Sequence, residues 1–163
     1  MMLIPLHCVH ARWGEEDAES LMIDPDGDLY VISKVHGGRG LLAKLPRGGW
    51  GAAHPVTIPT NDTAILRLHT SRNDPQGADI SPWGGELLVK AEEEVYYYRV
   101  PDGDYVGAVG RQVPQVVHTY VRRESGESVA WNAAGSGFYT LPEGRHPTFH
   151  LYMKAAAPGH VVG

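Results

Sequence analysis

Short apolar runs separated by turn residues dominate the hydrophobic pattern of the chain. Three times a turn lies between two such runs, at residues 24–32, 81–89 and 132–140. These segments begin 57 and 51 residues apart. Short strands that recur with a period near 50 residues are typical of the blades of a β-propeller. Apolar residues do not follow helical spacing for more than about one turn, so the pattern predicts an almost helix-free protein.

Each turn belongs to a unit of four predicted strands, of which the longest comes first. The strands are predicted at residues 3–12, 18–24, 29–34, 41–45, 63–70, 78–81, 87–91, 95–100, 115–122, 127–132, 138–141 and 148–154. Residues 47–60 and 101–113 are predicted connectors, the first with an edge strand at 56–58. A single domain, 1–154, thus holds three repeats at about 3–46, 63–100 and 115–154, followed by a flexible tail at 155–163.

The order of strands within a unit predicts how the blades close. In a propeller the outermost strand of one blade leads into the innermost strand of the next, so residues 3–12 would complete a blade made elsewhere. The third unit then lacks its own outer strand. Two chains related by a two-fold axis would close six blades as a homodimer and exchange these N-terminal strands. The predicted fold class is all-β, with three four-stranded antiparallel blades. Half of a longer propeller and a monomeric single-sheet sandwich remain as alternatives.

Composition and charge narrow the class of partner. The chain has 163 residues, of which 42% are hydrophobic, and 14 Lys and Arg stand against 19 Asp and Glu, for a net charge of -5. A negative net charge argues against a nucleic-acid partner, because phosphates are bound by basic surfaces. The N-terminus does not resemble a signal peptide and no apolar run has the length of a membrane span. A cytoplasmic protein without a membrane partner is therefore expected.

Three segments of this pattern carry a resemblance to a known class. Residues 17–34 (DAESLMIDPDGDLYVISK), 77–82 (GADISP) and 127–131 (ESVAW) resemble uncharacterised bacterial six-bladed β-propeller proteins. That broad class includes gluconolactonase-like, phytase-like and NHL-type propellers. The resemblance covers roughly residues 11–154 and matches only the C-terminal half of such chains. It implies the fold more than an activity, because propellers include hydrolases, lyases and binding modules.

Acidic residues recur at the start of the predicted innermost strands. Aligning the three turns places Glu19, Gln76 and Glu127 at equivalent positions. Carboxylates gathered around an axis suit a hard cation such as calcium, and the predicted metal ligands are Asp17, Glu19, Asp79 and Glu127. The alternative is a salt-bridge network in which Lys90 neutralises Glu19 or Glu127. No EF-hand loop supports a dedicated calcium site, and the nine histidines form no zinc signature.

Charged residues also recur where the third predicted strand of each unit meets the fourth. The predicted ligand-binding residues are Lys34, Lys90, Glu92, Glu143 and Arg145. Trp83 lies in a predicted turn, where an exposed ring could stack on a sugar. Two functions follow. One is a non-catalytic binding or scaffold module that recognises a small polar ligand or a peptide at the channel mouth, with or without a cation. The other is a calcium-dependent hydrolase or lactonase of the gluconolactonase-like type. Binding is favoured because no His or Asp is clearly placed as a general base, and no catalytic residue is assigned.

Overall fold

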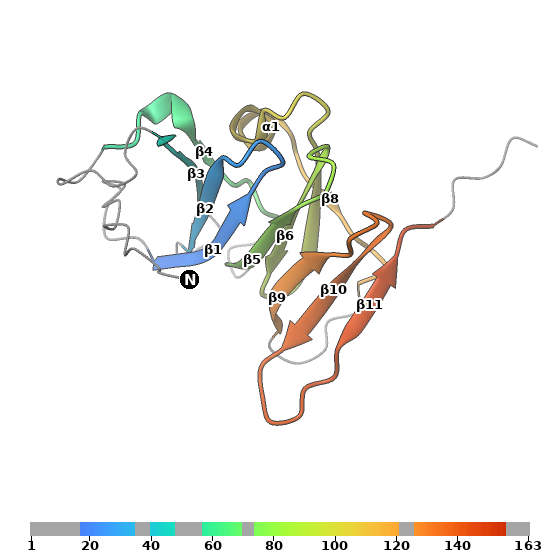
Figure 1. Ribbon diagram of the computed structural model, residues 1–163. Coiled ribbons are helices and arrows are strands. Elements are labelled where there is room, and N and C mark those ends of the chain that lie inside the picture. Colours follow the sequence, from blue (N-terminus) through green and yellow to red (C-terminus); the bar gives the residue numbers. More distant parts are fainter. Residues whose placement is uncertain (1–16, 35–39, 48–56, 70–73, 121–125, 156–163) are drawn as a thin grey trace, which may run out of the picture.

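The strands form three antiparallel sheets, as Figure 1 shows. The computed structural model describes residues 17–34, 40–47, 57–69, 74–120 and 126–155. The first sheet holds β1 (Asp17–Ile23), β2 (Leu29–Lys34), β3 (Leu41–Leu45) and β4 (Thr63–Ile65) in that order. The second holds β5 (Pro75–Ile80), β6 (Glu86–Ala91), β7 (Val95–Arg99) and β8 (Gln115–Val116). In the third, β10 (Gly137–Pro142) lies between β9 (Gly126–Trp131) and β11 (His150–Met153). The all-β prediction is confirmed.

The pairing of strands follows the predicted order. β4 pairs with β3, and β8 pairs with β7, so the first predicted strand of a unit is the outer strand of the preceding sheet. These outer strands are shorter than the predicted 63–70 and 115–122. Residues 57 and 58 form no strand, and the predicted strand at 3–12 lies outside the described residues. The third sheet has three strands in the described part of the chain.

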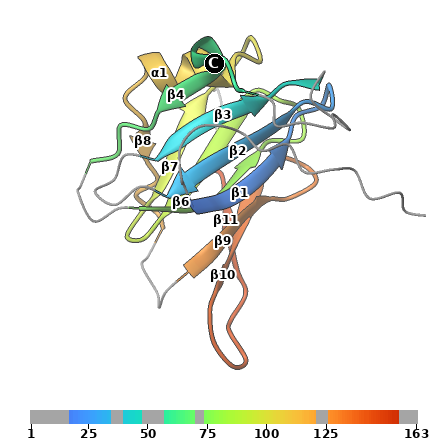
Figure 2. The same cartoon turned by 90° about the vertical axis from the view of Figure 1, so that its left-hand side faces the viewer.

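The three sheets pack face to face, with their first strands side by side. β5 contacts both β1 and β9, and Figures 1 and 2 show the sheets following one another in chain order. The middle sheet is therefore covered on both faces. This explains the apolar run Leu87–Val89 in β6, in which Leu87 and Val89 pack against the first sheet and Leu88 packs against the third.

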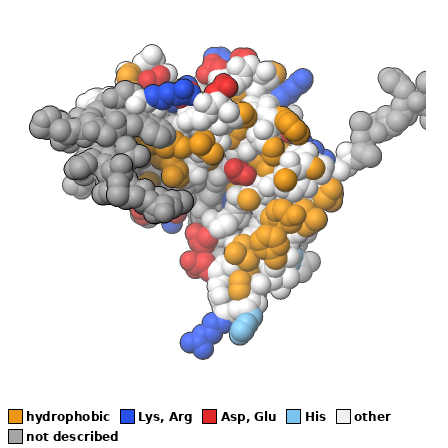
Figure 3. Space-filling model, viewed as in Figure 1, with side chains coloured by type: hydrophobic (Ala, Val, Ile, Leu, Met, Phe, Trp, Pro, Cys, Tyr) orange, Lys and Arg blue, Asp and Glu red, His pale blue; other side chains and the backbone are white. Residues whose placement is uncertain are grey.

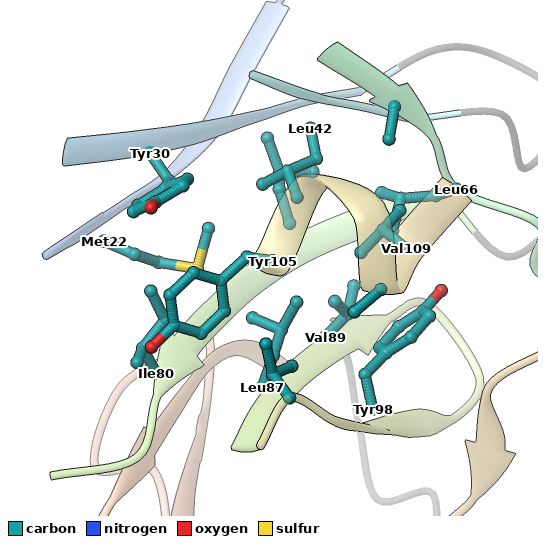
Figure 4. Packing of buried hydrophobic residues seen from close by; sticks show 14 of the residues in the cluster. Met22, Tyr30, Leu42, Leu66, Ile80, Leu87, Val89, Tyr98, Tyr105 and Val109 are labelled. Atoms are coloured by element: carbon teal, nitrogen blue, oxygen red, sulfur yellow. The ribbon is translucent and has the colours of Figure 1, made fainter. Parts of the chain in front are cut away.

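Two apolar cores lie between the sheets. The first, drawn in Figure 4, joins Met22, Tyr30 and Leu42 of the first sheet to Ile80, Leu87 and Val89 of the second. The second is smaller and joins Leu88 and Val95 to Val129, Trp131 and Phe138. Successive side chains of a strand point to opposite faces of its sheet, so alternate residues of the middle sheet enter the two different cores.

A helix, α1 (Tyr105–Arg111), lies within the predicted connector at 101–113 and was not expected. Asp104 caps its N-terminus by accepting a hydrogen bond from the Gly107 N–H at 2.8 Å. Its buried face, with Tyr105 and Val109, completes the first core (Figure 4). Two glycines in seven residues weaken its intrinsic helix propensity, so packing stabilises a helix that the local sequence does not predict. None of the helices in the described residues is long and apolar enough to cross a membrane.

Candidate functional site

The first strand of every sheet carries a β-bulge at the same relative position. In each case one extra residue lies between two consecutive backbone pairs, and these residues are Glu19, Gln76 and Glu127. A bulge leaves a residue outside the ladder and changes the direction of its side chain. Alignment of the turns predicted that these three positions are equivalent. In the structure they are equivalent because the same bulge occurs in each of the three sheets.

Hydrogen bonds connect the bulge residues to two lysines. The Gln76 side-chain amide donates to Glu127 Oε1 at 3.3 Å, and Lys90 Nζ donates to Gln76 Oε1 at 3.1 Å. Lys90 is fully buried and also donates to the carbonyl oxygens of Ala91 and Glu92. Lys34 Nζ lies 3.5 Å from Glu19 Oε1. The structure thus links Lys90 to Glu127 through Gln76, and it pairs Glu19 with Lys34.

The charge of Lys34 reports on the acidic surroundings of this cluster. Loss of solvent is the largest single influence and would lower the pKa of Lys34, but it is outweighed by the charge and hydrogen bond of Glu19 together with the charges of Glu127 and Asp74. The pKa of Lys34 is therefore raised. Carboxylates from neighbouring sheets thus stabilise the charged form of the same ammonium group, because the bulges bring them together near the starts of the first strands.

The remaining predicted metal ligands do not join this cluster. Asp79 Oδ2 accepts a hydrogen bond from the Trp131 N–H at 2.7 Å, which ties the second sheet to the third. Burial raises the pKa of Asp79, although its backbone hydrogen bonds oppose the change. Asp17 is exposed at the start of β1. Among the described residues, no three His, Cys, Asp or Glu side chains are arranged to hold a metal ion.

The predicted ligand-binding residues are spread over several loops. Glu92 is exposed in the turn between β6 and β7, where its N–H donates to the Asp74 carbonyl oxygen at 3.1 Å. Glu143 and Arg145 are exposed in the loop between β10 and β11. Lys34 and Lys90 belong to the cluster described above, and their side chains contact other groups of the chain.

A pocket that sequence reasoning missed lies at the opposite end of β1. It has a volume of about 360 Å³ and adjoins a hollow of about 300 Å³, with which it shares Tyr30, Lys44, Asp102, Gly103 and Tyr105. The two spaces lie between the β1–β2 turn, the β5–β6 turn and the start of α1. Six aspartates and one lysine line them: Asp24, Asp26, Asp28, Asp62, Asp102, Asp104 and Lys44.

Hydrogen bonds hold the tyrosines and aspartates of this pocket in place. The rings of Tyr30 and Tyr105 meet edge to face with centroids 5.0 Å apart, and Figure 4 shows both. The Tyr30 hydroxyl donates to Asp24 Oδ2 at 3.1 Å, and the Tyr105 hydroxyl donates to the Gly84 carbonyl oxygen at 2.7 Å. Asp24 Oδ1 accepts from the N–H groups of Asp26 and Asp28, which shapes the turn.

Electrostatics in the pocket favour positive charge. Lys44 Nζ lies 2.7 Å from Asp28 Oδ2, and hydrogen bonds from Lys44 and Arg47 lower the pKa of Asp28. Burial, with Asp24 and Asp26 nearby, raises the pKa of Tyr105 to about 12. Trp83, which lines one side, has 78% of its surface exposed, in agreement with its predicted place in a turn. The sequence signal for the pocket is the alternation of Asp24, Asp26 and Asp28, which by itself indicates only a hairpin turn.

Sequence comparison adds no relative to this picture. No protein-family model matches the chain, and no curated protein is significantly similar to it in sequence. The class that the structure defines is an all-β protein of three packed antiparallel sheets, with an acidic, aromatic pocket between the first two.

Proposed function

We propose that the chain is a β-propeller-type binding module that takes a small polar ligand bearing a cationic group. The observation that carries the proposal is the pocket between the first two sheets. Its volume is in the range of small-molecule sites, and tyrosine and tryptophan rings stand beside carboxylates in its wall. Aromatic faces and carboxylates both attract an ammonium or guanidinium group.

The protein's own lysine supports this choice of ligand chemistry. Lys44 Nζ contacts the Asp28 carboxylate and lies 5.6 Å from the centroid of the Tyr30 ring. A ligand cation that enters beside Trp83 would meet a similar combination of ring and carboxylate at Asp24 and Asp102. A phosphate or carboxylate ligand would be repelled by the same aspartates.

Binding is favoured over catalysis by the kinds of group that line the pocket. No histidine or cysteine lines the pocket or the adjoining hollow within the described ranges. A general acid or base works best with a pKa near the working pH, whereas the pKa of Tyr105 is raised to about 12 and that of Asp28 is lowered. The calcium-dependent lactonase is less favoured, because Glu19 pairs with Lys34 and Asp79 bonds the backbone.

Calorimetric titration tests the proposal with simple probes. Agmatine, spermidine and tetramethylammonium represent three kinds of cation, while glucose and inorganic phosphate serve as neutral and anionic controls. At least one cation is expected to bind with a sub-millimolar Kd that rises with salt. Asp102→Asn should weaken this binding roughly fivefold, since an exposed ion pair contributes up to about 1 kcal/mol.

The matched control is Asp17→Asn, which removes the same charge from an exposed site outside the pocket and should leave the Kd unchanged. The proposed ligand class is wrong if glucose or phosphate binds and no cation does. Cation binding that is equally strong in Asp102→Asn would mean that the pocket is not the site.

We further infer that the three sheets are blades of a propeller and that a second copy of the chain closes the ring to six. The adjacent first strands and the outer strands β4 and β8 support this inference, because a blade is built in that order. In the described part of the chain, β11 is an edge strand, and residues 3–12 of the partner are proposed to pair with it. The polar cluster at the three bulges would then occur twice around one channel.

A further inference from the structure

Both outer surfaces of the three-sheet stack expose large apolar side chains. On the first sheet, Leu21 and Ile23 of β1 are 66% and 61% exposed. On the third sheet the exposed residues are Leu141, Phe149, Leu151 and Met153, and Figure 3 shows apolar side chains gathered over β9 to β11. We call these surfaces the leading face (Leu21, Ile23) and the trailing face (Leu141, Phe149, Leu151, Met153). Patches of this kind commonly mark interaction sites.

The internal repeat shows what the leading face contacts in the other two sheets. The same backbone hydrogen bond closes each hairpin, from the N–H of Asp24, Ser81 or Asn132, and so makes these residues equivalent. Ile23 therefore corresponds to Ile80 and Trp131, which are only 5% and 8% exposed. Ile80 packs in the core against the first sheet, and Trp131 packs in the core against the second. This face thus packs on the preceding sheet wherever one is present.

The trailing face has the complementary role. Leu42 pairs with Ile32, and Val95 pairs with Lys90. In the third sheet, Leu141 is equivalent to Ile32 and Lys90, and Phe149 directly precedes β11, whose first residue, His150, pairs with Thr140. Leu42 and Val95 are fully buried against the next sheet, whereas Phe149 is 61% exposed. The trailing face of the third sheet is therefore equivalent to the face that, in the first and second sheets, packs against the next sheet in the chain.

We propose that the leading face of one chain packs on the trailing face of a second copy, and that the same contact is repeated across a two-fold axis. A second copy fits because each chain carries both halves of the contact and already builds it twice within itself. The two-fold arrangement covers all four open faces and leaves none to recruit further chains. This inference rests on the ring closure proposed above and names the surfaces that form it.

A pair of charge substitutions tests the matching of the faces. Ile23→Lys alters only the leading face and Leu151→Glu only the trailing face, and both residues are exposed, so each chain should still fold. In a homodimer of either variant, both interfaces would bury a charge against an apolar face. Light scattering should give the dimer mass for the unsubstituted chain and the monomer mass for each variant alone.

Mixing the two variants in equal amounts is the decisive step. One interface of the mixed dimer has no substitution, and the other sets the introduced lysine against the introduced glutamate only if the leading face meets the trailing face. The mixture is therefore expected to regain the dimer mass. Val113→Lys is the matched control, because Val113 is exposed and apolar but lies between α1 and β8, outside both faces. That variant should remain dimeric.

Three results would overturn the inference in distinguishable ways. A monomeric unsubstituted chain at every concentration would reject ring closure itself. If Ile23→Lys or Leu151→Glu remains a dimer, ring closure stands, but the face that carries the substitution is not part of the dimer interface. If both variants are monomeric alone and stay monomeric when mixed, both faces take part in the dimer, but the leading face does not pack on the trailing face. Leu21→Lys and Met153→Glu form a second pair, should circular dichroism show that a first variant is unfolded.

Discussion

Single polar side chains connect the sheets, and their partners differ from those that charge alone suggests. Asp79 is a predicted metal ligand, yet its carboxylate accepts the Trp131 N–H from the neighbouring sheet. Lys90 is a predicted direct partner of Glu19 or Glu127, and the structure links it to Glu127 through Gln76. Burial decides both cases, because a buried polar group must find a hydrogen-bond partner close at hand.

Asp79 is expected to make the stability of the protein depend on pH. Its pKa in the folded state is raised above the ordinary value of 3.8, so folding favours the protonated form. The associated stability is fully present below that ordinary value and is lost as the pH rises through the raised pKa. Asp79→Asn should therefore increase the urea midpoint relative to the unsubstituted chain by more at pH 7 than at pH 4. Asp17→Asn, at an exposed site, is the control. A difference that is the same at both pH values would contradict this account.

At the scale of elements, the repeated bulges and one glycine set how the first strands meet. Gly77 follows the bulge at Gln76, and a Cβ atom there would lie 2.9 Å from the Glu127 carbonyl oxygen. The equivalent residues in the other sheets are Ser20 and Ser128, so the need for glycine is specific to the contact between β5 and β9. The close approach of β5 to β9 thus depends on a glycine, which has no side chain, at position 77.

Gly77→Ala should destabilise the protein by about 1–3 kcal/mol, because the backbone of β9 must move to admit the methyl group. Gly85→Ala is the matched control, since nothing lies within 4 Å of the Cβ position there. Urea unfolding of both variants measures the difference. Equal midpoints for the two variants would show that β5 and β9 do not approach each other so closely.

At the scale of the whole molecule, three sheets form a stack, and the described residues on its two outer surfaces include exposed apolar side chains. The described chain pairs β4 with β3 and β8 with β7, while β11 remains an edge strand in the described part of the chain. Open strand edges and apolar faces favour association. The proposed dimer with exchanged N-terminal strands covers both.

Light scattering at several concentrations should therefore give twice 17.8 kDa for the full chain. Deletion of residues 1–12 should produce monomers or aggregates, because the proposed outer strand of the partner's third sheet is removed. A truncated chain that remains a well-behaved dimer would reject strand exchange while leaving contact between the leading and trailing faces in place.

Local rules were enough to predict most of the strands. β2 and β3 have the predicted bounds, and the turns at Gly27 and Gly135 follow from backbone angles that glycine adopts easily, with φ of 83° and 62°. Side-chain alternation and turn chemistry act between residues a few positions apart, so a single sequence contains them. The equivalence of Glu19, Gln76 and Glu127 was predictable for the same reason.

Tertiary structure decided the helix and the pocket. α1 is stabilised by burial of Tyr105 and Val109 in a core made largely by distant strands. The pocket depends on Tyr30 meeting Tyr105 and on Asp24 lying near Trp83, contacts between segments far apart in the chain. By itself, the sequence determined where the chain extends and turns, because those preferences are local. Which side chains share a cavity, and which carboxylates share a partner, depended on how the sheets pack, because packing brings together residues that no local pattern relates.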